Sequence, residues 1–535
     1  MKSLFPFIFA IALGLFSCSN KSDNYSKVAD VIVPKIVDYN FDVRPILSDK
    51  CFNCHGPDAK KRFADLRLDT EEGAYAALKD NANRHAIVPG KLKQSDVYAR
   101  ISSEDPESVM PPPDSKLSLS KNQIKIIKKW IQQGAKYKKH WAFLPVVKEA
   151  LPTIKNENWP VNEIDFFIAK KIEDQKLSPN KRADKERLLK RVAFDLTGLP
   201  PSITLQEKFL QDNSKDAYEK VVDQLLQSKH YGEKMTSSWL DVARFADSHG
   251  YQDDDLRTMW PWRDWVIHAF NENYSYDKFV TWQLAGDLIP NKNLESTLAT
   301  GFNRNHKISQ EGGIIVEEYR IETLTDRTNT FGKAFLGLTF ECAKCHDHKY
   351  DPISQKDYYR TFSFFEKTPY RKHAGGVNAT VAEPPYLTIS NKLAKDSLPF
   401  LNKKEYDAVR VMVMEERNEE RNTHVLNRGL YDAKGAIVTP NLPKSILTFD
   451  TNKLPQNRYG LSQWLFDPEN PLTSRVYVNR LWQEFFGVGI VKTVGDFGMQ
   501  GDLPSHVDLL NWLSKDFQEI FKRTIGISKD WSKKW

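Results

Sequence analysis

The cysteines constrain this chain more than any other feature of its sequence. Only five occur in 535 residues, and four of them form two copies of one short motif. The copies read Cys-x-x-Cys-His and consist of Cys51, Cys54 and His55, and of Cys342, Cys345 and His346. From composition alone, roughly 0.001 matches to this motif are expected in the whole chain. The repeated motif is therefore a functional signal.

Cys-x-x-Cys-His is the attachment signature of c-type haem. Two thiols three positions apart on one helical turn reach the two vinyl groups of a haem, and the adjacent imidazole then ligates the iron. A zinc site would need further Cys or His at short spacing, and a thioredoxin-like pair would need a βαβ context. The sequence lacks both features. It therefore predicts two covalent haem c groups, with His55 and His346 as proximal iron ligands.

The fifth cysteine, Cys18, ends an apolar stretch of the N-terminus that runs from Leu4 to Phe16. This stretch is too short to span a bilayer and has the pattern of a signal peptide. The ending Leu15-Phe16-Ser17-Cys18 resembles a bacterial lipoprotein cleavage box, so we expect Cys18 to be lipidated. A plain secretory signal is the alternative. Both predict a location outside the cytoplasm, where haem c is attached.

The sixth ligand of the first haem is expected from a proline-rich segment. Met110 precedes three prolines, about 55 residues after the first motif. A methionine in a stiff, extended loop can reach the haem face opposite His55, and its thioether is a good iron ligand. Ser120 and Gln123 then form a capping box for a closing helix that ends at Gly134.

The middle of the chain, residues 160–370, has helical periodicity and no sustained strand pattern, and one helix is expected over residues 316–338. His306 is the first candidate for the sixth ligand of the second haem. The alternatives are an open iron site and three other side chains, namely Met259, His249 and His268.

Two acidic clusters of this region could bind calcium or move protons, although a solvated surface explains them equally well. The first surrounds His249, and the second flanks Gly312 and Gly313. Their carboxylates belong to Asp247, Asp253, Asp254 and Asp255, and to Glu311, Glu317 and Glu318.

The net charge of +7 is small for this length, so nucleic acid is not expected as a partner. We expect redox partner proteins of the cell envelope instead, and a membrane reached through the lipid anchor. Apart from the N-terminus, the sequence contains no apolar stretch long enough to span a membrane.

Several segments resemble the planctomycete cytochrome c family, which combines a cytochrome c domain with two larger domains. The resemblance lies in residues 41–56, the Met110 loop, 130–135, 140–143, 195–201, 239–244, 284–287, 345–352, 470–480 and 496–498. It implies haem binding and a mainly α fold, with a small class-I-like cytochrome c domain followed by two mostly helical domains. The activity of the family is poorly defined.

The predicted organisation has seven parts. These are a lipoprotein signal peptide (1–18), a tether (19–37), the cytochrome c domain (38–139), a linker (140–160), the second haem-motif domain (161–370), a variable insertion or linker (371–455) and a truncated C-terminal domain (456–535). An extracytoplasmic, lipid-anchored dihaem electron carrier is the leading function. The alternatives are a peroxidase-like oxidoreductase with an open second haem and a polymer-processing or polymer-binding protein, so enzymatic activity stays open.

Overall fold

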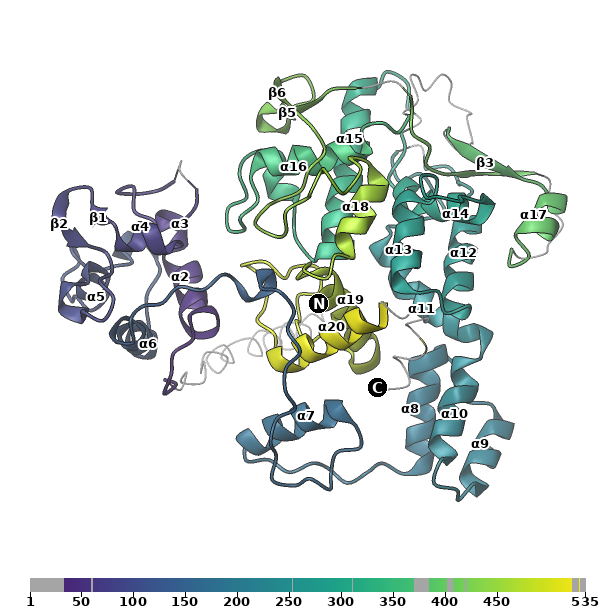
Figure 1. The fold of residues 1–535 in the computed structure, drawn as a ribbon, viewed down its shortest axis with the longest axis horizontal. Coiled ribbons are helices and arrows are strands. Elements are labelled where there is room, and N and C mark those ends of the chain that lie inside the picture. Colours follow the sequence, from purple (N-terminus) through teal and green to yellow (C-terminus); the bar gives the residue numbers. More distant parts are fainter. Residues whose placement is uncertain are drawn as a thin grey trace, which may run out of the picture. The chain divides into compact units, whose positions relative to one another are not determined.

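A computed structural model describes residues 33–58, 61–252, 254–309, 311–369, 384–401, 408–418, 421–521 and 529 (Figure 1). The chain divides into two compact units, residues 1–138 and 139–535. About 48% of it is helical, and the described residues contain 19 α-helices and three two-stranded sheets. The prediction of a mainly α fold is confirmed. No helix within these ranges is long and apolar enough to cross a membrane.

The first unit packs short helices around one apolar core. Its elements are α2 (Arg44–Lys50), α3 (Phe52–His55), α4 (Glu71–Tyr75), β1 (Ala77–Leu78), β2 (Asn81–His85), α5 (Asp96–Ile101) and α6 (Lys121–Gln132). Helix α6 begins with the predicted capping box, in which Ser120 accepts from the Gln123 amide and the Gln123 side chain accepts from the Ser120 amide. Its apolar face contributes Ile127 and Trp130 to the same buried cluster as Phe52 of α3.

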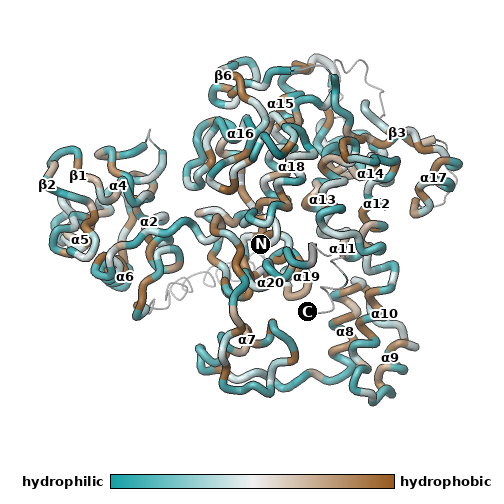
Figure 2. Tube along the Cα trace, in the orientation of Figure 1, coloured by the Kyte–Doolittle hydropathy of each residue, from teal (hydrophilic) through white to brown (hydrophobic). Residues whose placement is uncertain are grey.

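The second unit is built from helices in which hydrophilic and hydrophobic residues alternate along the chain (Figure 2). The first group is α7 (Glu163–Asp174), α8 (Lys185–Thr197), α9 (Ile203–Gln211), α10 (Ala217–Leu226), α11 (Lys229–Val242), α12 (Trp260–Asn271), α13 (Tyr276–Ala285) and α14 (Leu294–Ala299). Helix α11 packs on both α8 and α12. Large aromatic side chains fill this region, and Trp239 of α11 lies 5.1 Å from Phe279 of α13 between ring centroids.

Helix α15 (Val316–Phe331) leads towards the second cysteine motif and is followed by α16 (Gln355–Phe362). The single helix expected over residues 316–338 is interrupted, because a π-type turn (Gly332–Leu336) follows α15. That turn ends at Gly337, whose φ of +56° favours glycine. A Cβ there would also lie 2.8 Å from a methyl group of Val476.

Residues 371–455, predicted as a variable insertion or linker, contain regular structure where they are described. Strands β3 (Tyr386–Ile389) and β4 (Val409–Met412) pair antiparallel, as do β5 (Thr423–Leu426) and β6 (Lys434–Val438), and α17 (Asn391–Ser397) follows β3. The amide of Met414, just after β4, donates to Thr300 Oγ1 at 2.8 Å. This segment therefore contributes to the core of the second unit.

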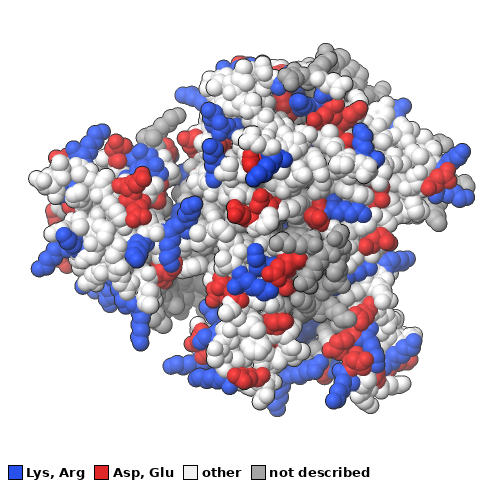
Figure 3. All heavy atoms as spheres, in the orientation of Figure 1, with Lys and Arg blue, Asp and Glu red and all other residues white. Residues whose placement is uncertain are grey.

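The C-terminal part contains α18 (Arg458–Leu465), α19 (Thr473–Phe486) and α20 (Val507–Phe521). The predicted linker at residues 140–160 begins as a segment that is docked on these helices. Arg475 of α19 is buried and donates to the backbone oxygens of Ala142 and Leu144, at 3.3 and 2.7 Å. On the face shown in Figure 3, acidic and basic side chains are interspersed.

Candidate functional site

The first cysteine motif forms one helical turn between α2 and α3. The amides of Cys54 and His55 donate to the Cys51 carbonyl at 3.1 and 2.8 Å, so both thiols and the imidazole belong to the same turn. The chain after the motif returns to it, because the amides of Phe63 and Leu68 donate to the carbonyls of Cys54 and His55. This is the local geometry that the attachment of one haem requires.

The surroundings of this motif are apolar and aromatic. Tyr137 lies 4.7 Å from Tyr39 and 5.2 Å from Trp130 between ring centroids, and its hydroxyl donates to the Leu68 carbonyl at 3.0 Å. Burial, with a smaller effect of the Cys54 sulfur, raises the pKa of the Cys51 thiol to about 12.

The imidazole of His55 has a ring nitrogen without a hydrogen-bond partner among the described residues. Burial lowers the pKa of the imidazole, and this nitrogen, Nδ1, is itself buried. Two thiols and a half-buried imidazole on one turn beside an apolar core fit haem c. When bound, haem supplies one-electron redox chemistry. The residues of the protein hold the iron ligands in place and exclude water.

Met110 belongs to the same unit as this motif. Its amide donates to the carbonyl of Arg100, near the end of α5, at 3.2 Å, and its side chain is half-buried. Helix α5 contributes Val97 and Ile101 to the core that also contains Phe52. The Met110 backbone is thus hydrogen-bonded to a helix of the core that also contains Phe52 of the first motif, and ligation by Met110 stays a prediction.

The second motif has the same donor atoms in different surroundings. Cys342 and Cys345 are exposed, and the turn between them is a 3-10 helix (Glu341–Lys344). His346 is exposed too, and its Nδ1 lies 2.7 Å from the Asp347 carbonyl. Donation from Nδ1 to that carbonyl leaves the Nε2 lone pair available for a metal, as in many metal-ligating histidines. The donor set therefore fits haem c here as well.

Charged and polar groups hold this second turn in place. Lys344 Nζ lies 2.6 Å from Glu322 Oε1 of α15, and Glu341 forms an ion pair with Lys333. The Gln355 amide nitrogen donates to the carbonyls of Lys344 and Leu426, both at 3.0 Å.

The turn after β5 comes close to the second motif. A Cβ at Gly429 would lie 2.9 Å from the sulfur of Cys345. A larger residue there would displace the thiol, which explains a glycine at φ +73° in this turn.

Both ring nitrogens of His306, the first candidate for the sixth ligand of the second haem, contact protein groups in the structure. This residue is 2% exposed, its Nδ1 contacts the carbonyl of Lys307 at 2.9 Å, and its Nε2 lies 3.2 Å from Nη2 of Arg327. Because an arginine can only donate, His306 Nε2 accepts this hydrogen bond and its lone pair is engaged. Burial, with the charge of Arg327, holds the imidazole pKa well below its usual range. Ligation of the second haem by His306 stays a prediction, and it would require Nε2 to release Arg327.

The other candidates for that ligand lie in separate environments. Met259 is fully buried and directly precedes α12 in the sequence, as its N-cap residue. His268 stacks on Phe400 at 4.3 Å between ring centroids. His249 is 1% exposed, and both its ring nitrogens lack a hydrogen-bond partner among the described residues.

The segment after the second motif docks on the C-terminal part. His348 Nδ1 accepts from the Asp351 amide at 2.8 Å, and Asp351 Oδ1 accepts from the Met499 amide at 2.8 Å. Gly498 leaves room for this contact, since a Cβ there would lie 2.3 Å from Asp351 Oδ2. Burial, with the charge of Asp351, raises the pKa of Asp496. Two of the motifs in which the sequence resembles its family therefore meet.

The acidic clusters do not form a metal site within the described part of the chain, which contains no group of three or more Asp, Glu, His or Cys suited to a metal ion. Asp247, Asp254 and Asp255 are exposed, and Asp253 lies outside the described residues. Glu317 pairs with Arg320 and Arg421 at 2.7 and 3.0 Å.

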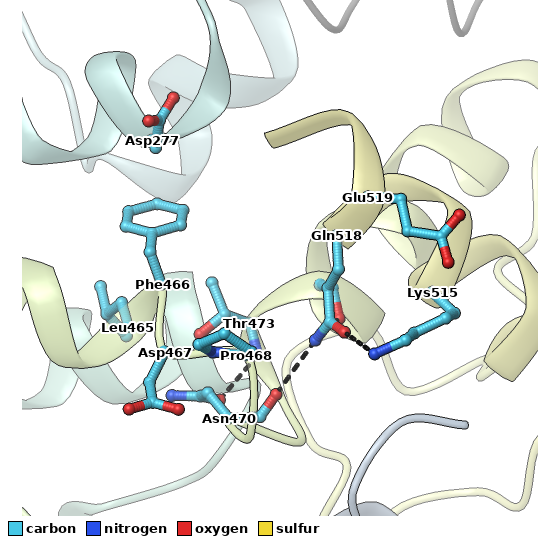
Figure 4. A pocket seen from close by; sticks show the side chains of 11 residues that line it. Asp277, Leu465, Phe466, Asp467, Pro468, Asn470, Thr473, Lys515, Gln518 and Glu519 are labelled. Atoms are coloured by element: carbon cyan, nitrogen blue, oxygen red, sulfur yellow. Dashed lines mark hydrogen bonds between the residues drawn. The ribbon is translucent and has the colours of Figure 1, made fainter. Parts of the chain in front are cut away.

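A pocket of about 190 Å³ lies elsewhere, between the start of α13 and helices α19 and α20 (Figure 4). Asp277, Phe466, Asn470, Thr473 and Gln518 line it, and none of the four motif cysteines does. It is smaller than the roughly 300–1,000 Å³ of typical small-molecule sites, so it is no candidate for a haem site.

Sequence reasoning missed a set of buried polar side chains beside His249. Arg257 is 7% exposed and donates to the carbonyls of Ala246, Asn305 and His306. Burial, with the charge of Arg244, lowers the pKa of Arg257 to about 10. The sequence feature that could have indicated this set is the presence of arginines in segments that are otherwise apolar or loop-like.

Three family comparisons match the chain in order. The family described as Planctomycete cytochrome C matches residues 51–114, a protein of unknown function (DUF1549) matches residues 163–370, and a second one (DUF1553) matches residues 457–533. No curated protein and no solved structure matches the chain.

The first match includes Cys51, Cys54, His55 and Met110, so the class of the first unit is a cytochrome c domain. The three matches, in this order, match the planctomycete cytochrome family, as the resemblance in the sequence predicts.

Proposed function

We propose that this protein is a dihaem c-type cytochrome that transfers electrons outside the cytoplasm. The observation that carries the proposal is the first motif, where two thiols and an imidazole with a buried Nδ1 atom share one turn that packs against an apolar core. In this proposal Cys51 and Cys54 bind the first haem covalently, and His55 and Met110 ligate its iron. Cys342, Cys345 and His346 hold the second haem.

The experiment is a haem count on the full chain, produced with a c-type maturation system. The pyridine haemochrome assay should give two haems per chain. Cys54→Ala and Cys345→Ala should each remove or weaken one attachment. A ratio near one in the unmutated protein would refute the second site.

A second candidate function is a haem-dependent oxidoreductase with an open iron site. His346 is exposed and the Nε2 atom of His306 is engaged by Arg327, which favours an open position on the second haem. Catalysis on peroxide or oxygen needs such a position. Carbon monoxide binding to half of the reduced haem would support this candidate, and no binding would favour electron transfer alone.

Anchoring through Cys18 is also part of the proposal, although this residue lies outside the described part of the structure. One acyl group alone binds membranes marginally, whereas several chains on one cysteine anchor a protein stably. Cys18→Ser should release the protein from the membrane fraction. Unchanged fractionation, with no lipid on the N-terminal peptide in mass spectrometry, would contradict the anchor. Redox proteins of the cell envelope are the proposed partners.

A further inference from the structure

Two segments of the middle domain that are about 50 residues apart in sequence form one polar cluster. The Arg257 guanidinium donates through Nη1 to the His306 carbonyl at 2.7 Å and through Nη2 to the Asn305 carbonyl at 3.0 Å. Its Nε donates to the Ala246 carbonyl, and the Ile308 amide donates to the His249 carbonyl at 3.1 Å. Arg257 thus holds residues 246–249 against residues 305–308, and it lies close enough to Arg244 for the two charges to interact.

Three side chains of these segments have buried hydrogen-bonding atoms that are unused; those of His249 and Asn305 are buried as a whole, and that of Arg244 is 25% exposed. Both ring nitrogens of His249, both amide atoms of Asn305, and Nε and Nη1 of Arg244 have no partner among the described residues. His249 is 1% and Asn305 is 2% exposed. Buried polar groups in native proteins nearly always have partners, so a concentration of unpartnered ones indicates a missing ligand or bound water.

The charge of the cluster indicates which kind of ligand it would take. The guanidinium of Arg257 donates its hydrogen bonds to backbone oxygens. No carboxylate among the described residues contacts it to balance its charge. Arg244 contacts one carboxylate, since its Nη2 lies 2.7 Å from Asp326 Oδ1. Asp326 is thus the one carboxylate among the described residues that contacts either arginine, whereas the exposed Asp247 and Asp254 act on Arg257 through their charge alone. A further negative charge beside the free donors of Arg244 would be stabilised there.

We propose that Arg244, His249 and Asn305 form a binding site for an oxyanion, meaning a phosphate, sulfate or carboxylate group. The free Nε and Nη1 atoms of Arg244 present two donors to one such group. Neutral His249 adds one donor, and the amide of Asn305 adds another. Arg257 contributes charge and holds the two segments together.

The site is close to the second cysteine motif. Asp326 lies one turn after Glu322 on α15, and Glu322 pairs with Lys344 of the motif. Four residues of helix rise correspond to about 6 Å. The site also reaches the surface, because the side chain of Asp326 is 32% exposed.

The test is isothermal titration of the full-length, haem-loaded protein with inorganic phosphate and with sulfate, at constant ionic strength set with chloride. One ion per chain should bind. Arg244→Gln should weaken binding by roughly 10- to 100-fold, because a charge-assisted pair of hydrogen bonds is lost. Asp326→Asn should strengthen binding several-fold, because it removes the anion that competes for Arg244.

Arg187→Gln is the matched control, since Arg187 lies on α8 of the same unit with its side chain 63% exposed. It should bind as the unmutated protein does. If Arg244→Gln fails to fold, as judged by circular dichroism, Asp326→Asn and His249→Asn decide. No binding either to the haem-loaded protein or to the Cys342→Ala/Cys345→Ala variant, or equal affinity in the unmutated protein and in the Arg244 and Asp326 variants that fold, would overturn the proposal.

A carboxylate could also come from the propionates of the second haem, and the Cys342→Ala/Cys345→Ala variant separates the two sources. Phosphate binding with and without the second haem would identify a free oxyanion as the ligand. Phosphate binding only without that haem would identify the haem carboxylates. Both results support an oxyanion site, and the haem count of the variant is measured separately.

Discussion

The two Cys-x-x-Cys-His segments of this chain share two cysteines and a histidine and little else. The first closes into the apolar core of a small unit, where Tyr137 and Trp130 pack nearby and Met110 is tied to the same core. The second lies on an exposed turn, held by the ion pair of Lys344 with Glu322. The motif therefore specifies the donor atoms, whereas the residues around it determine solvent access, ligation and potential.

The largest expected difference concerns the fold of each unit without its haem. Cys51→Ser/Cys54→Ser should remove one of the two haems and destabilise the first unit, because its core is built around the motif and binding energy adds to stability. Cys342→Ser/Cys345→Ser should remove the other haem and leave the helical content unchanged, because these thiols are exposed. Haem counts and thermal unfolding by circular dichroism measure both. Equal destabilisation by the two double variants would contradict the comparison.

Replacement of Met110 should act on one haem alone. Met110→Ala should abolish the weak near-infrared band of methionine ligated to ferric iron and lower one reduction potential by on the order of 0.1 V or more. The potential of the other haem should stay the same, since its motif belongs to the second unit. An intact band in the variant would show that the loop is a structural turn only.

His306→Ala should cost stability and leave haem ligation unchanged. Arg327 Nη2 would lose its hydrogen bond to His306 Nε2, and the loss of a buried, charge-assisted hydrogen bond typically destabilises a protein by about 1–3 kcal/mol. Urea unfolding measures this loss, and the haem spectrum is the second readout. His346→Ala is the matched control, because it should change the spectrum. A spectral change in the His306 variant would support the sequence-based assignment.

The lowered pKa of His306 also predicts a smaller effect, in which the stability of the second unit depends on pH. The pKa of His306 in the folded state lies well below the unfolded value of about 6.5. The unfolded chain therefore binds a proton that the folded chain excludes, and stability falls as the pH drops below about 6.5. A fully suppressed histidine accounts for about 2 kcal/mol at pH 5. The loss between pH 7 and pH 5 should be smaller in His306→Gln, and an equal loss in both proteins would argue against this origin.

Some of this structure could be predicted from local sequence. Helical periodicity and the absence of long strands gave the mainly α fold, and Ser120 with Gln123 gave the start of α6. The strands of residues 386–438 were missed, because each is only four or five residues long and carries little periodic signal.

The partners of single side chains depend on tertiary contacts. His306 lies in a polar stretch that suggested an exposed loop, yet Arg327 buries and engages it. The turn at Gly429 reaches Cys345 from more than 80 residues away. The assignments of haem ligands and of Cys18 stay predictions, because they need bound cofactor or lipid to be tested.

The central claim, two haems in unlike surroundings, is tested most directly by a spectroelectrochemical redox titration of the purified full-length protein. We predict two one-electron waves of equal amplitude at separate potentials, with the near-infrared methionine band disappearing in the higher wave as iron is reduced. Burial and methionine ligation raise the potential of the first haem, and solvent exposure distinguishes the second. A single wave from one haem per chain, or two waves with no methionine band, would contradict the account.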